Sequence, residues 1–324
     1  MTSSIILPFD LNVEMRMYHN KAFPLGIIKA NIKNYDLWLC NKLINCVNWS
    51  SGSFDSFEED IWSQKEGLTF SQNIYFAPPS ILYEGINIIE LNKSMLRSGS
   101  YVLGAYNEYH IPRKRDYNST NFNHDYILFG FDDNDCTFKS VAYLEDMSYS
   151  LFDIKYEHYL NGVIDNKIKK TYVNYYKIDN TFIPKIDIQF IRQNLENYLS
   201  SRRNLNYVSS KEVYGIDVWI ELAKYVESAG DILDFRFGRA CMEHHGLMLK
   251  RIQTLLKNQY IANETIEKEY ADIYYKTKIV HNLFIKYNIS KERELLKRII
   301  SLLKTVVDDE RRVIKLLIDD IDAK

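Results

Sequence analysis

The chain has 324 residues, of which 46% are hydrophobic, enough for one large domain or two of ordinary size around a sizeable core. The formal net charge of −2 excludes the global basic field that is typical of nucleic-acid-binding proteins. No run reaches the roughly 18 apolar residues of a membrane span, and the opening MTSSIILPFD has no signal-peptide pattern. We therefore expect a cytoplasmic bacterial protein without a membrane or nucleic-acid partner.

The four cysteines are few for this length, and no two of them form a CxxC pair, which favours a reducing compartment. Cys40 and Cys46 fall in an apolar helical pattern, which is typical of core residues. Cys136 stands among aspartates, whose negative charge would raise the pKa of its thiol. A hydrolase that uses Cys40 or Cys46 as its nucleophile is one alternative for the function.

The first half of the chain mixes helix and strand patterns. Residues 18–32, YHNKAFPLGIIKANI, predict a helix in which Pro24 marks a boundary or a kink. Residues 35–47, YDLWLCNKLINCV, predict further helix. One face of this second pattern carries Leu37, Cys40, Leu43 and Val47.

Two elements follow in the chain. Residues 87–99, NIIELNKSMLRSG, predict a helix closed by Gly99. Residues 101–112, YVLGAYNEYHIP, predict a strand that Pro112 ends.

A hairpin is expected next, over residues 121–149, NFNHDYILFGFDDNDCTFKSVAYLEDMSY. It begins with His124 at the head of a strand, turns at residues 132–135, which are rich in Asp and Asn, and returns as a second strand. Helix, central strands and a hairpin predict an α+β domain with an antiparallel sheet.

From about Asp187 onward the 3.6-residue apolar period dominates. The sequence therefore predicts an α+β domain over residues 1–186 and a helical domain over 187–324. The apolar faces of the long helices can be buried within one chain or between two chains of a homodimer. The helical patterns cover residues 209–226, 235–256, 264–287 and 292–321.

The segment CMEHH, residues 241–245, places a cysteine and two histidines three and four positions apart on one helical side. Zinc would need a fourth ligand and supporting partners, and no second such cluster occurs in the sequence. We expect buried histidines held by hydrogen bonds, with Glu243 paired to Arg239 or Arg236. No metal and no cofactor are predicted.

Several of these segments resemble one family. Residues 98–112, SGSYVLGAYNEYHIP, then His124, then residues 126–132, YILFGFD, resemble the papain-like proteins of bacterial natural-product clusters. The butirosin acyltransferase type is one relative, and a papain-like enzyme that forms amide bonds in polythioamide assembly is another. Residues 213–226 and 236–252 resemble the helical region of such proteins. The resemblance implies a papain-like fold followed by a helical domain.

The family's catalytic triad is Cys, His and Asp. Such catalysis needs a thiol at a helix N-terminus, an imidazole from the sheet and a third group that orients the imidazole. His124 matches the imidazole. The nucleophile would fall in residues 11–27, LNVEMRMYHNKAFPLGI, but no cysteine precedes Cys40. Met17 and Tyr18 are the nearest matching positions, and neither side chain can attack an acyl thioester at neutral pH.

A branch of the superfamily that lacks the cysteine carries a DEYYIP-like segment before the histidine, and residues 107–112, NEYHIP, resemble it. The orienting acid is expected on the hairpin's return strand, but Ala142 and Tyr143 occupy that stretch, and the acids Glu145 and Asp146 stand slightly beyond it. Glu108, within the NEYHIP segment, is the third candidate for this role.

Five further residues are candidates for substrate binding. Tyr18, Tyr109 and His110 are expected to line the wall of a cleft near His124. Arg113 and Arg115 could meet the phosphate of a phosphopantetheine arm or an acidic helix of a carrier protein. A solvated basic loop is the alternative for these two arginines.

In this family an acyl or peptidyl group passes from the phosphopantetheine thiol of a carrier protein to an amine. The first hypothesis is therefore an acyltransferase of bacterial natural-product assembly, such as nonribosomal peptide assembly. His124 would be its general base, and the amine would attack the thioester directly. The second is a pseudoenzyme, an inactive scaffold that binds a carrier protein or a peptide.

Overall fold

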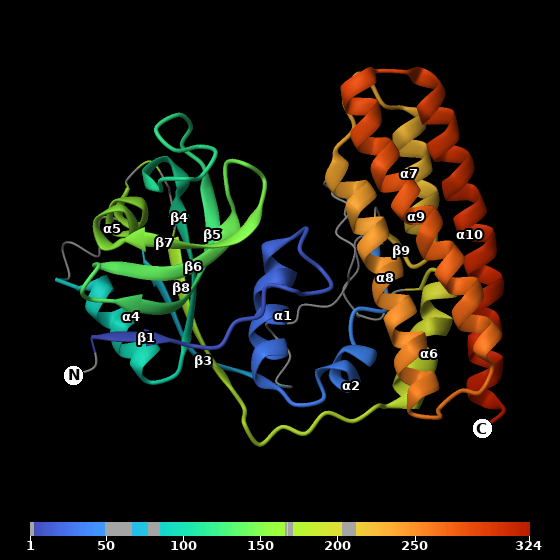
Figure 1. The fold of residues 1–324 in the computed structure, drawn as a ribbon, viewed down its shortest axis with the longest axis horizontal. Coiled ribbons are helices and arrows are strands. Elements are labelled where there is room, and N and C mark those ends of the chain that lie inside the picture. Colours follow the sequence, from blue (N-terminus) through green and yellow to red (C-terminus); the bar gives the residue numbers. More distant parts are fainter. Residues whose placement is uncertain (1–2, 49–66, 77–84, 166, 168–170, 203–211) are drawn as a thin grey trace. The chain divides into compact units, whose positions relative to one another are not determined.

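The chain forms two compact units. Its computed structural model describes residues 3–48, 67–76, 85–165, 167, 171–202 and 212–324 (Figure 1). The sheet unit comprises Met1–Lys33 and Ile61–Ile183, and the helical unit comprises Asn34–Asp60 and Pro184–Lys324. The division near Ile183 lies close to the expected boundary at 186, whereas the segment from Asn34 groups with the helical unit and not with the first domain.

An antiparallel sheet forms the centre of the sheet unit, which makes the chain an α+β protein. The strand order is β3-β8-β4-β5-β6-β7, and β1 pairs with β5 off this path. Every described pairing in this sheet is antiparallel. The strands are β1 (Ser4–Ile6), β3 (Leu68–Phe76), β4 (Tyr101–Asn107), β5 (Asn123–Asp132), β6 (Thr137–Tyr143), β7 (Tyr149–Lys155) and β8 (Thr171–Ile178).

The predicted hairpin is confirmed as β5 and β6. The Asp132 carboxylate accepts a hydrogen bond from the Asn134 amide at 2.9 Å, the local turn that short acidic side chains favour. Cys136 takes a positive φ of 51° in this turn. Thr137 then pairs with Asp132 and opens the return strand. The hairpin places His124 as the second residue of β5.

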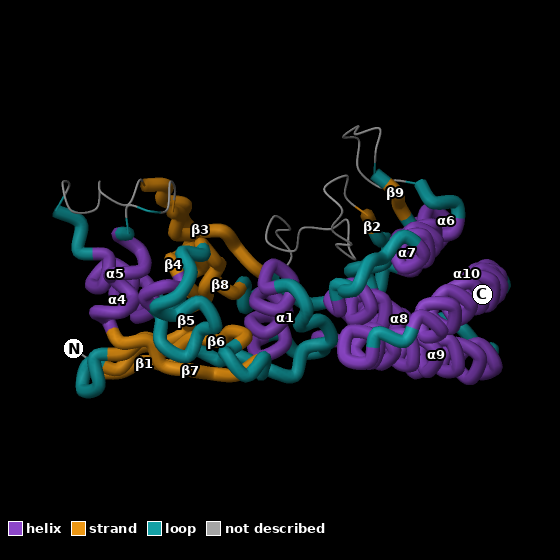
Figure 2. Tube along the Cα trace, turned by 90° about the horizontal axis from the view of Figure 1, so that it is seen from above, coloured by secondary structure: helices purple, strands orange, loops and turns teal. Residues whose placement is uncertain are grey.

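Among the described residues, the helices that cover the sheet are α1 (His19–Asn31), α4 (Ile88–Arg97) and α5 (Tyr156–Ile164). The pair α4 and α5 lies on one side and α1 on the other (Figures 1 and 2). On the first side, Ile88, Leu96, Tyr159 and Val163 pack with sheet residues into one buried cluster. On the second side, Phe9 stacks on Phe129 of β5 with ring centroids 5.2 Å apart.

The helix predicted from residue 87 to Gly99 is confirmed as α4. The side chain of its N-cap, Asn87, accepts a hydrogen bond from the Glu90 amide at 3.1 Å, which satisfies one of the free amides of the first turn. Beyond Arg97 the chain turns at Gly99, whose φ is +83°. Glycine adopts this left-handed conformation without steric cost.

The helix predicted over residues 35–47 is wrong beyond Cys40. The helix α2 covers only Tyr35–Cys40, and Val47–Asn48 forms strand β2, paired with β9 (Val213–Tyr214). The cause is a tertiary contact. Arg251 donates to the carbonyl of Cys40 at 2.8 Å and to that of Lys42 at 2.5 Å. These carbonyls are therefore occupied by a buried guanidinium, not by amides of a continuing helix.

The helical unit is built mainly from α6 (Ile188–Leu199), α7 (Asp217–Glu227), α8 (Phe235–Lys257), α9 (Glu264–Ser290) and α10 (Arg293–Asp322). The long helices α8, α9 and α10 run side by side (Figure 1). The predicted helices over 235–256, 264–287 and 292–321 are confirmed. Of the helix predicted over 209–226, residues 209–211 lie outside the described chain, and α7 begins at Asp217.

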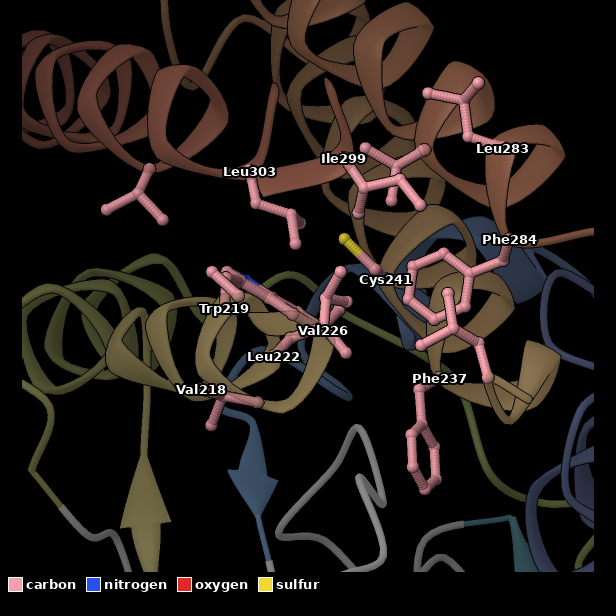
Figure 3. Packing of buried hydrophobic residues seen from close by; sticks show 14 of the residues in the cluster. Val218, Trp219, Leu222, Val226, Phe237, Cys241, Leu283, Phe284, Ile299 and Leu303 are labelled. Atoms are coloured by element: carbon pink, nitrogen blue, oxygen red, sulfur yellow. The ribbon is translucent and has the colours of Figure 1, made fainter. Parts of the chain in front are cut away.

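The core of the helical unit is mainly aliphatic and aromatic (Figure 3). Gly238 allows α8 to approach α9 closely, because a Cβ there would lie 2.9 Å from the ring of Phe284. Glu243 pairs with Arg239 at 2.9 Å, one of the two partners expected from the sequence. The labelled core residues in Figure 3 are Val218, Trp219, Leu222, Val226, Phe237, Cys241, Leu283, Phe284, Ile299 and Leu303.

A fully buried carboxylate, Glu310 of α10, lies within this bundle. His245 of α8 contacts it at 3.2 Å through Nε2, and the hydroxyl of Tyr198 donates to it at 2.8 Å. The hydroxyl of Tyr270 donates to the other carboxylate oxygen. His245 also contacts the Cys241 carbonyl at 2.7 Å through Nδ1. Both ring nitrogens therefore donate, so the pair is an imidazolium and a carboxylate.

We expect Glu310→Ala to lower the free energy of unfolding by roughly 3–5 kcal/mol, because it leaves a buried imidazolium without its counter-charge. Asp308→Ala, at an exposed position of the same helix, is the control and should change stability little. Denaturant titration followed by circular dichroism measures both variants. Equal stability of the two variants would contradict this role of Glu310.

The same pair predicts a pH dependence. Burial alone would lower the pKa of His245, but the charge of Glu310 raises it well above 6.5. Burial alone would raise the pKa of Glu310, but His245 brings it from 4.5 to about 2. The contribution of His245 is complete below pH 6.5 and is lost as pH rises through its raised pKa. The contribution of Glu310 is complete above pH 4.5 and is lost as pH falls through about 2.

The pair therefore stabilises the unit most between pH 4.5 and 6.5. We expect the free energy of unfolding to decline as pH is raised above this window. Denaturant titrations across a pH series measure the slope, and His245→Gln should flatten it. If His245→Gln shows the same pH dependence of the free energy of unfolding as the wild-type protein, other groups cause that dependence.

Candidate functional site

The strand β4 and the short turn after it bring an acid to His124. Tyr106 of β4 pairs with His124 of β5, and the chain leaves β4 through a 3₁₀ turn, Glu108–His110. The Asn107 side chain accepts hydrogen bonds from the amides of Tyr109 and Phe122, each at 3.1 Å. This amide side chain thereby ties the turn to the start of β5 and fixes the place of Glu108.

Glu108 holds the His124 ring. Its Oε1 lies 2.6 Å from His124 Nδ1. A carboxylate can only accept, so Nδ1 is the donor, and in the neutral ring Nε2 is the nitrogen that carries the lone pair. Within the described chain Nε2 has no hydrogen-bond partner, and the His124 side chain is 34% exposed. The imidazole is thus oriented on one side and available on the other.

Lys114 shares the same carboxylate oxygen at 2.7 Å and donates to the Tyr143 carbonyl at 3.0 Å. The side chains of Lys114 and Glu108 are only 2% and 4% exposed. Burial would raise the pKa of Glu108, but the His124 hydrogen bond and the Lys114 charge hold it below its usual value. Burial lowers the pKa of Lys114, with Glu108 opposing. Glu108 is therefore an ionised orienting group.

A second histidine stands against the first. His19 is the first residue of α1 and only 7% exposed. Its ring stacks on Phe23 at 4.5 Å and on His124 at 4.6 Å. Neither of its ring nitrogens has a hydrogen-bond partner in the described chain.

Charge and burial keep His19 neutral. Burial lowers its pKa well below 6.5, and the electrostatic interactions with His124 and Lys114 act in the same direction. The backbone of Asp125 acts in the opposite direction, but it does not reach hydrogen-bond geometry with either nitrogen. A neutral imidazole retains one N–H donor and one acceptor.

The N-terminus of α1 lacks a side-chain cap. Tyr18, the N-cap, is half-buried and makes no capping hydrogen bond, while its carbonyl accepts from the amides of Lys21 and Ala22 at 3.0 and 2.9 Å. Of the other amides in the first turn, those of His19 and Asn20 have no partner among the described residues. The helix therefore begins with free amide donors at the residue whose ring stacks on His124.

The two candidate acids beyond the return strand, Glu145 and Asp146, make no contact with His124 in the described structure. Glu145 and Asp146 occupy the exposed turn between β6 and β7, and no described interaction joins either carboxylate to His124. The Glu145 amide donates to the Arg113 carbonyl at 2.8 Å. The Asp146 carboxylate accepts from the Ser148 amide at 2.9 Å. Of the three candidate acids, the structure therefore brings only Glu108 to the imidazole.

In the described chain, the candidate binding residues Tyr109 and His110 contact other residues and not His124. His110 contacts the Asp165 carboxylate at 2.8 Å, and the Tyr109 ring meets His110 edge-on with centroids 5.2 Å apart. No described hydrogen bond or ring contact joins either residue to His124. Arg113 and Arg115 are exposed, on either side of the buried Lys114.

Sequence reasoning missed His19 and Lys114. His19 stands within residues 11–27, where a thiol was expected, four positions before Phe23 on the same helix face. Its position at the start of a predicted helix, where the family's nucleophile is expected, could have identified it as a candidate site residue. Lys114 stood among the loop arginines, and its burial depends on how the loop folds back onto Glu108.

Among the described residues, no contact joins a cysteine to His124 or Glu108. Cys46 lies in the helical unit, fully buried, with its Sγ 3.1 Å from His244 Nδ1. Burial raises the pKa of the Cys46 thiol and lowers that of His244, so both groups stay neutral. Burial also raises the pKa of Cys40 to about 11. Neither thiol therefore has the properties of a nucleophile.

Comparison with protein-family models and with curated protein sequences found no match. Among the described residues, no three His, Cys, Asp or Glu side chains are grouped as a metal site would require. The helices of the described chain include none with the length and apolar character needed to cross a membrane.

We expect Glu108→Gln to destabilise the sheet unit by roughly 3–5 kcal/mol, because it removes the counter-charge of the buried Lys114. Glu145→Gln, in an exposed turn of the same unit, serves as the control. Denaturant titration measures both. If Glu108→Gln is as stable as Glu145→Gln, the ion pair with Lys114 does not hold the site together.

Proposed function

We propose that the chain transfers an acyl or peptidyl group from a carrier-protein thioester to an amine, with His124 as general base. One observation carries the proposal. A half-exposed imidazole, oriented by a buried ionised Glu108, stands beside the N-terminus of α1. An oriented base next to a helix N-terminus is the arrangement that papain-like catalysis uses. The resemblance of residues 98–112, His124 and residues 126–132 to papain-like proteins of natural-product clusters supports the same function.

In this reaction the acyl donor is already activated, because it is a thioester. The amine attacks the thioester carbonyl carbon, and His124 Nε2 accepts the proton that the amine loses. Collapse of the adduct breaks the C–S bond, and the departing thiolate takes that proton from His124. Glu108 stabilises the imidazolium in between. Holding the two reactants together can contribute roughly 7–11 kcal/mol at best, so no acyl-enzyme is needed.

The carrier protein is the proposed partner. Arg113 and Arg115, exposed in the loop that carries Lys114, are the proposed contacts for the phosphopantetheine phosphate or for an acidic carrier helix. Tyr18, at the start of α1, and Tyr109 and His110, in the turn beside Glu108, are the proposed contacts for the substrate.

A scaffold without catalysis is the second candidate. The buried Lys114 engages the same carboxylate oxygen as His124, and the segment in which a thiol was expected, residues 11–27, places His19 at the site instead. Both features fit a site that has kept its structure and lost its reaction. Such a protein would bind a carrier protein or a peptide without turnover.

The two candidates differ in turnover. With acyl-loaded carrier protein and an amine, we expect His124→Ala to lower the rate of amide formation by roughly 10²–10⁴-fold, the range that a general base contributes. His158→Ala, on α5 of the same unit, is the control. Equal rates in both variants would remove His124 from the mechanism, and no turnover by the wild-type protein with any donor would favour the scaffold.

A further inference from the structure

Buried polar atoms without partners gather beside His124. Besides both ring nitrogens of His19, the hydroxyl of Tyr149 in β7 lacks a hydrogen-bond partner among the described residues. The two rings lie 6.5 Å apart between centroids. An unsatisfied buried polar group costs roughly 1–3 kcal/mol, so three such atoms in one place call for an explanation.

Two of these three atoms, one His19 nitrogen and the Tyr149 oxygen, can act as neutral donors. The buried His19 ring is neutral and keeps one N–H. Burial also raises the pKa of Tyr149, so its hydroxyl keeps its proton. A neutral imidazole and a phenol are groups that enzymes use to donate to a carbonyl oxygen as it gains negative charge.

We propose that His19 and Tyr149 hydrogen-bond the thioester carbonyl oxygen while it carries negative charge. This rests on the proposed function. When the amine attacks the carbonyl carbon, the π electron pair moves to the oxygen, and the two donors stabilise that oxyanion. The free amides of His19 and Asn20 at the helix start add to the positive potential. Collapse returns the electron pair and expels the thiolate.

Access to the donors requires one ring to move. The His19 nitrogens and the Tyr149 hydroxyl are shielded from solvent. His124 covers one face of His19, and it is the half-exposed member of the stack. In this proposal a small shift of the His124 ring that keeps the Nδ1–Glu108 hydrogen bond admits the carbonyl, which then replaces the missing hydrogen bonds.

The kinetic test uses His19→Phe and Tyr149→Phe, which keep an aromatic ring and remove the donor. We expect kcat to fall by roughly 10²–10³-fold in each, the loss typical of one oxyanion donor, with KM little changed. His19→Gln, which retains an N–H donor, should recover part of the rate. Tyr117→Phe, at an exposed tyrosine of the same unit, is the control.

Stability separates catalysis from a structural role. Because Tyr149→Phe and His19→Phe remove unsatisfied polar atoms, Tm should stay equal or rise. A lower Tm together with lower kcat would indicate a structural role and overturn the inference. Wild-type kcat in both variants, with His124→Ala inactive, would overturn the inference and leave the proposed function standing.

A spectroscopic test does not depend on turnover. Acetyl-pantetheine bound to His124→Ala should show a lower infrared C=O stretching frequency than free acetyl-pantetheine. Adding His19→Phe and Tyr149→Phe should abolish the shift. A shift that depends on these residues would support the inference even if the wild-type protein catalyses nothing. An absent or unchanged shift, or an acyl adduct on His19 detected by mass spectrometry, would overturn it.

Discussion

The carboxylate of Glu108 is the group on which the candidate site depends. It is almost completely buried, and such a charge is tolerated only when it is paired. Lys114 supplies the opposite charge and His124 supplies a hydrogen bond, both to the same oxygen. Because Lys114 also donates to the Tyr143 carbonyl, the carboxylate links the loop after β4, the start of β5 and the end of β6. The orientation of His124 follows from this link.

The two histidines of the site receive opposite environments. His124 has an anionic partner on one side and partial exposure on the other. His19 has aromatic rings around it, is buried near Lys114, and stays neutral. One ring is therefore suited to move a proton and the other to donate a hydrogen bond without losing it. That division of roles resembles acid and base assignments produced by environment alone.

The helical unit also contains a buried carboxylate that is paired, but this one is closed to solvent. Glu310 is fully buried and pairs with His245, and two tyrosine hydroxyls complete its hydrogen bonds. Both side chains of this pair are fully buried. The pair therefore stabilises the packing of the bundle and is not open to a substrate. The Cys46–His244 pair beside it is equally closed and uncharged. Buried titratable groups thus surround a half-exposed histidine in the sheet unit and are fully enclosed in the helical unit.

Local patterns in the sequence determined the hairpin with His124 on β5, the α4 helix closed at Gly99, and the long helices α8, α9 and α10. Each depends on contacts within a few positions, which periodicity and turn chemistry report. Only the tertiary structure chose Glu108 over Glu145 and Asp146, because that choice depends on the register of β4 against β5 and on the Asn107 link. Only the tertiary structure ended α2 at Cys40, through Arg251, and placed His19 against His124. These contacts join residues far apart in the chain, and no local pattern encodes them.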